Sequence, residues 1–201
     1  PLMISIVNSG HTVLGYDINT KVVEKLNSKK CHLNLWKDKV NRVIEPGINA
    51  EFSASPEILT DAEVVIICVP TPLSQGNLPD HSYVDHAFEK ISSFFKGRLV
   101  ILESTVSPGY TRNAGQKFLG QKLLLNGGNV SLCFSPERED PGNEKFTSVE
   151  IPKVIGGLTQ ECLERGVRLY MRIFQHVVQA TSVEAAEFCK VHENTFRAIN
   201  I

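Results

Sequence analysis

Short apolar runs alternate along the chain with longer segments in which apolar residues recur every three or four positions. Apolar runs bounded by Gly, Pro, Ser or Asp predict buried strands, and the longer periodic segments predict helices. We predict strands over residues 11–17, 51–55, 63–69, 98–103, 130–134, 153–157 and 176–181. We predict helices over residues 2–8, 19–27, 37–43, 56–61, 80–95, 110–125, 159–174 and 182–201. This alternation indicates an α/β fold of Rossmann type, with a doubly wound, mostly parallel sheet.

Three of the predicted strands end in small hydroxyl or acidic residues. The strand 63–69 leads into Pro70-Thr71, the strand 98–103 ends at Glu103, and the strand 130–134 leads through Ser135-Pro136 to Glu137. Ligands of open α/β sheets bind just beyond the carboxyl ends of the strands. We therefore expect one site along this edge, with the Glu137 carboxylate placed for chemistry rather than for packing.

A fourth strand, 11–17, ends in Asp17, and a helix follows it. An acid at the end of the second strand of a dinucleotide-binding unit hydrogen-bonds the adenosine ribose. An Asp that caps the following helix has the same sequence pattern, so both interpretations stay open. No G-x-G-x-x-G motif occurs in the sequence, and both ends fall inside predicted helices. We expect a fragment in which the first strand and the Gly-rich turn of the unit are missing.

Charge and cysteine content narrow the function classes. The 21 Lys and Arg residues nearly balance the 22 Asp and Glu residues, so no basic field indicates nucleic acid or a membrane surface. The longest apolar run, 64–70, is too short to cross a bilayer. The five cysteines are scattered without metal-ligand spacing, which indicates small buried hydrophobes in a reduced, cytoplasmic protein without a metal site.

The last predicted helix has two distinct sides. Ala185, Phe188, Cys189, Phe196 and Ile199 lie on one side at helical spacing, and Glu187, Lys190, Asn194 and Arg197 lie on the other. The polar side is typical of a solvated face, but Lys190 and Asn194, one turn apart, also fit a pair directed at a ligand. The spacing Thr181-x-x-Glu184 predicts a capping box at the start of the helix.

Seven motifs follow one another along nearly the whole chain: GYDIN, VIICVPTPL, PDHSYV, LESTVSPG, FSPEREDPGN, IPKVIGG and KVHENTFRAIN. Together they resemble the UDP-glucose/GDP-mannose dehydrogenase family. FSPEREDPGN and NTFRAIN are most similar to its branch of UDP-N-acetyl-D-glucosamine 6-dehydrogenases. Members of the family oxidise a hexose carbon-six hydroxyl to a carboxylate with two molecules of NAD. The resemblance thus implies NAD as cofactor and UDP-N-acetylglucosamine or UDP-N-acetylmannosamine as substrate.

The resemblance also implies an organisation. Residues 1–181 would form an incomplete NAD-binding Rossmann-like domain, and residues 182–201 would begin a long helical linker to a second domain. In the full-length protein, a homodimer would form through this central helix. The fragment alone would be inactive, because the family's nucleophilic cysteine lies in a Gly-rich motif beyond residue 201.

Roles carry over by position from the resemblance. Asp17 would bind the adenosine ribose, whereas Val69, Pro70 and Thr71 would line the NAD crevice. Thr105 would contact the cofactor, lie beside the reacting carbon and help to order water.

Further positions would act on the sugar. Glu137 would serve as acid and base, and Lys190 and Asn194 would stabilise the oxyanion. Glu137, Arg138, Lys190, Asn194 and Arg197 would contact the substrate. These residue types suit the chemistry, because hydride leaves an alcohol more readily as its proton is drawn away. Ammonium and amide donors stabilise a developing alkoxide.

Departures and alternatives remain. The family's basic residue five positions after the ribose acid is here Val22, and a second Glu of the glucose-type members is here Pro141. UDP-glucose is the alternative substrate. A β-hydroxyacid or 6-phosphogluconate dehydrogenase, which shares Lys-x-x-x-Asn on a long helix, is an alternative enzyme class. An inactive truncated paralogue is the alternative that is not an enzyme.

Overall fold

The computed structural model describes residues 2–28, 30, 50–76, 78–137 and 151–200. Its strands are β1 (Val13–Tyr16), β2 (Ala50–Ser53), β3 (Val64–Ile67), β4 (Leu99–Leu102), β5 (Ser131–Phe134), β6 (Lys153–Gly157) and β7 (Val177–Gln179). Its longer helices are α1 (Leu2–Asn8), α2 (Thr20–Asn27), α4 (Ser82–Phe94), α6 (Gln160–Tyr170) and α7 (Val183–Asn200). Each predicted strand is present, with ends that differ by a few residues. The helix predicted over 37–43 lies outside the described residues.

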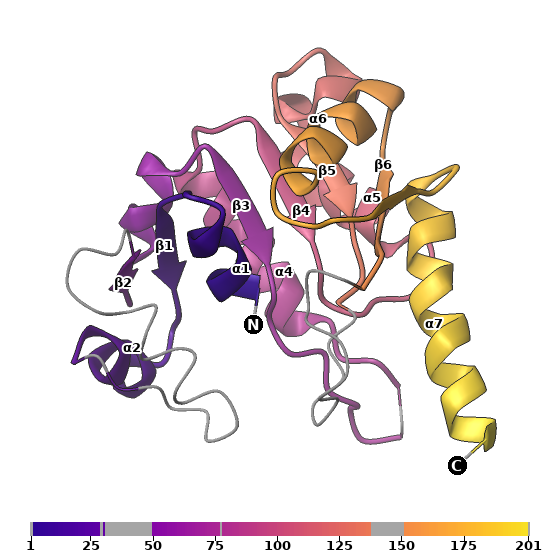
Figure 1. Cartoon of the computed structure of the whole chain (residues 1–201), viewed down its shortest axis with the longest axis horizontal. Coiled ribbons are helices and arrows are strands. Elements are labelled where there is room, and N and C mark those ends of the chain that lie inside the picture. Colours follow the sequence, from indigo (N-terminus) through magenta and orange to yellow (C-terminus); the bar gives the residue numbers. More distant parts are fainter. Residues whose placement is uncertain (1, 29, 31–49, 77, 138–150, 201) are drawn as a thin grey trace.

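The strands form two sheets (Figure 1). Strands β1 and β2 pair in parallel, and β3, β4, β5, β6 and β7 form a second sheet in that order. Strands β3, β4 and β5 are parallel, β6 runs antiparallel to β5, and β7 is parallel to β6. The α/β prediction with mostly parallel pairing is therefore confirmed, although the described strands make two sheets rather than one.

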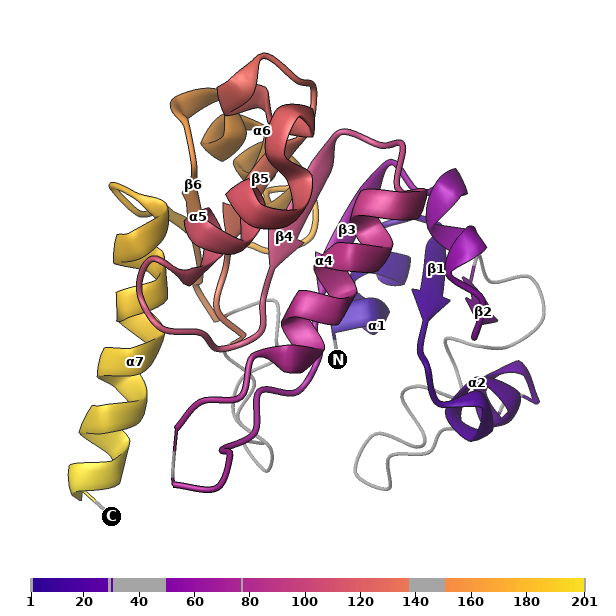
Figure 2. The same ribbon diagram turned by 180° about the vertical axis from the view of Figure 1, so that it is seen from behind.

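Helices cover both faces of the larger sheet. Helices α1 and α6 lie in front of it in Figure 1, whereas α4 and the short helix α5 (Tyr110–Ala114) lie in front in the reverse view of Figure 2. Strands β4 and β5 are buried along their whole length because helices cover both of their faces. Helix α4 packs through Val84, Phe88 and Ile91, whose spacing places them on one side of the helix.

The helix predicted over 110–125 is wrong in its second half. Helix α5 continues as one π-helical turn, Gly115–Leu119, and then as short 3₁₀ turns, Gly120–Lys122 and Leu124–Asn126. At Gly120 the backbone φ is 45°, which interrupts the α-helical path. The apolar spacing persists through these turns because Leu119 and Leu123 still enter the core. Periodicity alone therefore overestimated the length of the helix.

Helix caps partly follow the sequence pattern. Thr159 caps α6 by accepting a hydrogen bond from the Cys162 N–H at 3.2 Å, as its position predicts. The prediction of a capping box at Thr181 is wrong. Helix α7 begins at Val183, and the Ser182 hydroxyl accepts from the Ala185 N–H at 3.1 Å. Glu184 instead pairs with Arg112.

Among the described strands, β1 and β3 each have one edge without a partner strand. Within the described ranges, β1 pairs with β2 alone and β3 pairs with β4 alone. In the Rossmann order 3-2-1-4-5-6, the first strand lies between the strands that correspond to β1 and β3. The separation of the two sheets thus falls at the position where the sequence predicts a missing strand.

We expect this edge of β3 to be visible by amide hydrogen exchange of residues 1–201. Amides of β3 that face away from β4 should exchange much faster than the amides of β4, which has partners on both sides. Strand β4 is the internal control, because it lies in the same sheet. Equal protection of all β3 and β4 amides would contradict the prediction and show that another segment covers this edge.

Candidate active site

The exits of β3, β4 and β5 meet at one edge of the sheet, as predicted. The parallel register aligns Ile67 with Leu102 and Leu102 with Phe134, so the three strands end level with one another. Hydrogen bonds hold the exits together. The Ser104 hydroxyl donates to the Val69 carbonyl at 2.7 Å, and the Ser135 hydroxyl donates to the Val154 carbonyl at 2.6 Å. The small hydroxyl residues therefore fix the loops from which the candidate site is built.

The residues predicted to act at this edge differ in exposure. Val69, Thr71, Thr105 and Glu137 are half-buried, whereas Pro70 is exposed. Half-burial suits side chains that line a crevice, because they combine a fixed position with access to a ligand. Arg138 lies outside the described residues, so its predicted substrate contact stays a prediction.

Asp17 lies exposed just beyond β1. Its carboxylate accepts a hydrogen bond from the Asn19 N–H at 2.8 Å, and Asn19 in turn caps α2 by accepting from the Lys21 N–H at 3.1 Å. The cap of α2 is therefore Asn19, so the alternative in which Asp17 itself caps the helix is wrong. Asp17 instead stabilises the turn before the helix, with its carboxylate at the surface.

A buried ionic cluster lies directly beneath the ends of strands β3, β4 and β5. The sequence pattern did not predict that its residues come together. The Lys153 ammonium donates to the Glu103 carboxylate at 2.9 Å, with the two side chains only 4% and 1% exposed. The Tyr170 hydroxyl donates to the other oxygen of Glu103. The Lys153 nitrogen also lies 5.7 Å from the Tyr170 ring and 5.4 Å from the Phe174 ring. The cluster thus connects the end of β4 with β6 and α6. Its carboxylate, Glu103, lies two residues before Thr105 in the sequence.

Burial raises the pKa of Glu103 to about 7. The Lys153 ammonium opposes this shift, the nearby Glu137 carboxylate adds to it, and the Tyr170 hydroxyl opposes it by donating a hydrogen bond. Glu137 is thus close enough to the buried carboxyl for like charges to interact. Two carboxyl groups in one site, one of them buried, are a common arrangement where protons are moved.

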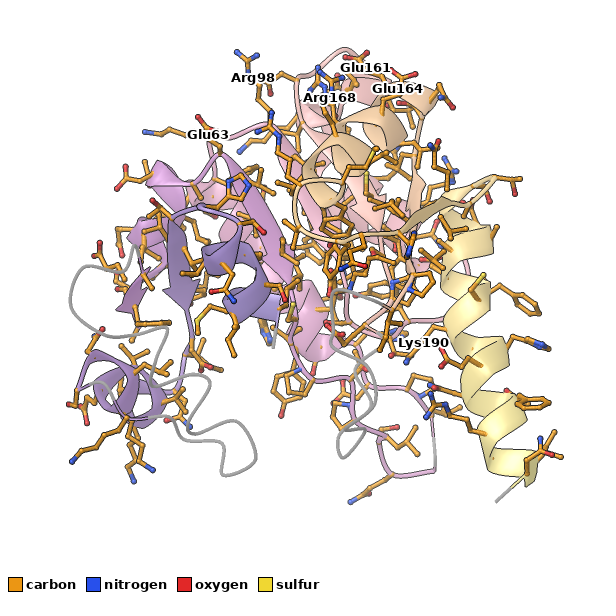
Figure 3. All side chains as sticks on the ribbon, viewed as in Figure 1. Glu63, Arg98, Glu161, Glu164, Arg168 and Lys190 are labelled. Atoms are coloured by element: carbon orange, nitrogen blue, oxygen red, sulfur yellow. The ribbon has the colours of Figure 1, made fainter. Side chains whose placement is uncertain are left out.

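Helix α7 packs on the sheet through the side that carries Glu187, not through the side that carries its aromatic residues. Glu187 is fully buried and the Lys190 side chain is 16% exposed, whereas Asn194 and Arg197 are exposed. Figure 3 shows Lys190 on the side of α7 that faces the sheet. The solvated-face interpretation is therefore wrong for Glu187. Lys190 is 4.0 Å from Glu193, which also pairs with Arg197 at 3.0 Å.

The apolar side of α7 faces outward. Phe188, Phe196 and Ile199 are 57%, 62% and 77% exposed. The first half of the helix is anchored through Val183 and Ala186, which are fully buried on the same side as Glu187. The helix then extends past the carboxyl edge of the sheet in both ribbon views (Figures 1 and 2).

The cysteines follow the sequence prediction in part. Cys133 and Cys162 are buried, as predicted, but Cys68 and Cys189 are exposed. Although part of Cys68 reaches solvent, the protein atoms packed around it raise the pKa of its thiol, and the Glu103 and Glu137 carboxyls add to the shift. A thiol with a raised pKa is a poor nucleophile. Cys31 lies outside the described residues.

Within the described residues, no group of His, Cys, Asp and Glu side chains could hold a metal ion. No helix in that part of the chain is long and apolar enough to cross a membrane.

Parallel strands with helices on both faces, an exposed acid after β1 and a polar edge at the exits of β3, β4 and β5 define a dinucleotide-binding domain of the Rossmann class. The sequence pattern of the UDP-glucose/GDP-mannose dehydrogenase family, NAD binding domain, matches residues 1–174. The chain belongs to this family. The resemblance inferred from the seven motifs is confirmed at this level.

Relatives and solved structures agree with the assignment. UDP-N-acetyl-D-mannosamine dehydrogenase from Pyrococcus horikoshii is 32% identical over 205 residues, which cover 100% of this chain and 48% of the relative. The structure of UDP-D-ManNAc dehydrogenase from the same organism superposes with a TM-score of 0.85 at 31% identity, over 100% of this chain and 48% of that one. The UDP-N-acetyl-mannosamine dehydrogenase Cap5O from Staphylococcus aureus gives a TM-score of 0.83 at 32% identity, over 99% and 48%. This chain spans about half the length of these relatives.

Proposed function

We propose that this chain is the NAD-binding half of a UDP-sugar 6-dehydrogenase that oxidises the carbon-six alcohol of a UDP-N-acetylhexosamine to the uronic acid. The observation that carries the proposal is the shared edge at which Thr105 and Glu137 follow the neighbouring strands β4 and β5, with Lys190 on the side of α7 that faces the sheet. The family and the N-acetylmannosamine relatives support the substrate class. The preference for UDP-N-acetylglucosamine or UDP-N-acetylmannosamine rests on the FSPEREDPGN loop and on Arg197. Residues 1–181 would form the cofactor domain, and α7 would begin the central helical domain.

The residues that follow strands β1 and β3 suit NAD. Strands β1 and β3 point in the same direction (Figure 1), so Asp17 and the segment Val69-Pro70-Thr71 follow their carboxyl ends on either side of the separation between the sheets. An exposed carboxylate such as that of Asp17 is the acceptor type that ribose hydroxyls require. NAD would accept hydride from the sugar carbon. Val69, Pro70, Thr71 and Thr105 would line its crevice.

The polar side chains would move the proton and stabilise charge. Glu137 would take the alcohol proton, directly or through a water molecule that Thr105 helps to order. Its negative charge also contributes to the raised pKa of the buried Glu103 carboxyl. Lys190 and Asn194 would donate hydrogen bonds to the oxyanion. Arg138 and Arg197 would contact the substrate. In a homodimer, the exposed Phe188, Phe196 and Ile199 of the central helix would be covered by the partner.

Stoichiometry tests the proposed function. We expect the complete gene product to reduce two NAD per UDP-sugar, because an alcohol becomes a carboxylate in two successive oxidations. NADH absorbance, measured with limiting sugar, gives the ratio. A ratio of one would instead support the β-hydroxyacid class of dehydrogenase, which transfers one hydride. No NAD reduction with any UDP-sugar would support an inactive paralogue.

Substrate preference is a separate prediction. We expect kcat/KM for UDP-N-acetylglucosamine or UDP-N-acetylmannosamine to exceed that for UDP-glucose by about tenfold or more, the range expected from one well-placed group in a site. Initial rates with all three sugars, at one NAD concentration, give the ratio. Equal specificity constants would rule out the N-acetylhexosamine preference and favour the glucose alternative.

A further inference from the structure

The buried carboxylate of Glu187 lies at the junction between α7 and the connection that follows β4. One carboxylate oxygen accepts a hydrogen bond from the Gly109 N–H at 2.6 Å, and the other accepts from the Thr111 N–H at 2.8 Å. Glu187 is fully buried, so water does not compete for these bonds. Charge-assisted hydrogen bonds of this kind are about twice as strong as neutral ones. The carboxylate therefore acts as a two-point connection between segments 76 and 78 residues apart in sequence.

The donors belong to the first turn of α5, where backbone N–H groups lack partners within the helix. Gly109 precedes the helix with φ of +90°, a conformation that a glycine adopts without strain and that directs its N–H toward α7. The same connection, from Ser104 to Gly109, carries Thr105. Glu187 thus holds the segment that contains one proposed catalytic side chain.

Spacing along α7 links Glu187 to the other proposed catalytic side chains. Lys190 lies three residues later and Asn194 seven residues later, which places both on the side of the helix that carries Glu187, about one and two turns on. The helix is fixed before this point. A Cβ atom at Gly156 of β6 would lie 2.4 Å from the Ser182 carbonyl oxygen, so strand and helix approach closely there. Glu187 is also the last fully buried residue of α7 before the helix extends past the sheet.

We propose that Glu187 is a positioning residue, whose carboxylate sets the rotation of α7 so that Lys190 and Asn194 face the Thr105 loop. The role rests on the proposed function, since it concerns the alignment of that site. A second carboxylate, Glu184, also joins the helix to α5 through Arg112 at 2.6 Å, but both side chains are more than 30% exposed. An exposed pair contributes little to stability, so Glu184 supports the helix without fixing its rotation.

Kinetics of the complete gene product give the first test. In Glu187→Gln one acceptor oxygen remains, and in Glu187→Ala none does. We expect kcat to fall about tenfold in the first variant and about a hundredfold in the second, with KM for the UDP-sugar nearly unchanged. Misalignment of reacting groups raises the barrier more than it weakens ground-state binding. Glu184→Gln is the matched control, because it removes a carboxylate one turn away and leaves the backbone bonds of Glu187 intact. An equal loss of kcat in the control, or none in Glu187→Ala, would overturn the proposal.

Amide hydrogen exchange gives a second test that does not depend on activity. Glu187→Ala should release the Gly109 and Thr111 amides and increase exchange over residues 188–194, whereas Glu184→Gln should leave all of them close to the parent. Equal exchange in both variants would overturn the positioning role. If the parent oxidises no UDP-sugar, the proposed function fails, while the exchange comparison still decides whether Glu187 fixes α7.

Discussion

Replacement of Lys190 by Ala is expected to reduce kcat of the complete gene product by a hundredfold or more, with a smaller change in KM. Loss of one donor to a developing oxyanion typically costs about a hundredfold to a thousandfold in rate. The Lys190 side chain is 16% exposed and lies on the side of α7 that faces the sheet. A partly desolvated ammonium stabilises charge better than an exposed one, because water screens it less. The measurement is a steady-state comparison of kcat and KM with saturating NAD.

A control variant separates this effect from a general loss of charge. Lys117→Ala removes an ammonium that is 62% exposed and pairs with Asp85 of α4. It should leave kcat within about twofold, as for most exposed surface substitutions. A Lys190→Ala enzyme with normal kcat would limit Lys190 to a structural role, such as its contact with Glu193. A variant with normal kcat but a much higher KM would limit Lys190 to ground-state binding.

The strand exits could be predicted from sequence because they depend on local signals. An apolar run that stops at Pro70, at Glu103 or at Pro136 marks its own end, whatever surrounds it. Parallel pairing then places such exits at one edge without further information. The same reasoning located the position of Glu137. It also located the separation between β1 and β3, since the Rossmann strand order is a topological rule.

The orientation of α7 could not be predicted in the same way. A helix with Glu187 and Lys190 on one side and Phe188 and Phe196 on the other favours burial of the aromatic side. In the structure the aromatic side is exposed, because the opposite side buries Val183 and Ala186 and places the Glu187 carboxylate on backbone N–H groups. A sequence pattern separates polar from apolar positions, but it does not distinguish a carboxylate hydrated by water from one bound to backbone.

The ionic cluster beneath the site depends on strand direction. Because β6 runs antiparallel to β5, its first residue, Lys153, lies at the edge where the parallel strands end. A parallel β6 would have placed Lys153 at the opposite edge, away from Glu103. The sequence signal available was a lysine at the start of an apolar run, which is also common at exposed strand ends. Lys153 and Glu103 are 50 residues apart in sequence, so their pairing could be identified only from the tertiary structure.

Replacement of Lys153 by Met is expected to destabilise the complete gene product strongly, and more at alkaline than at acidic pH. Removal of one partner of a buried ion pair typically costs about 3–5 kcal/mol, because the other charge remains buried. The remaining charge here is that of Glu103, which is 1% exposed. Burial raises the pKa of Glu103 from 4.5 to about 7, with Lys153 opposing the shift. Without the ammonium, that pKa should rise further.

The sign of the pH dependence follows from proton binding. A carboxyl whose folded-state pKa is raised binds its proton more tightly in the folded protein, so its contribution to stability is fully present below pH 4.5 and is lost as the pH rises through about 7. In the parent this loss is complete above that range. In Lys153→Met it should continue to higher pH, by about 1.4 kcal/mol per pH unit, until the new pKa is passed. The free-energy difference between parent and variant should therefore be small near pH 5 and large near pH 9.

The double variant Lys153→Met/Glu103→Gln is the decisive comparison. A neutral amide at position 103 still accepts the hydrogen bond from Tyr170 but carries no charge, so most of the stability should return and the pH dependence should disappear. Thermal unfolding on either side of the Glu103 pKa measures both effects, with an expected fall in the midpoint of roughly 10 °C for the single variant at alkaline pH. Equal destabilisation of Lys153→Met at both pH values, unrelieved by Glu103→Gln, would show that Lys153 acts through its packing against Tyr170 and Phe174. Such a result would mean that the charge of Glu103 does not govern the stability of this edge.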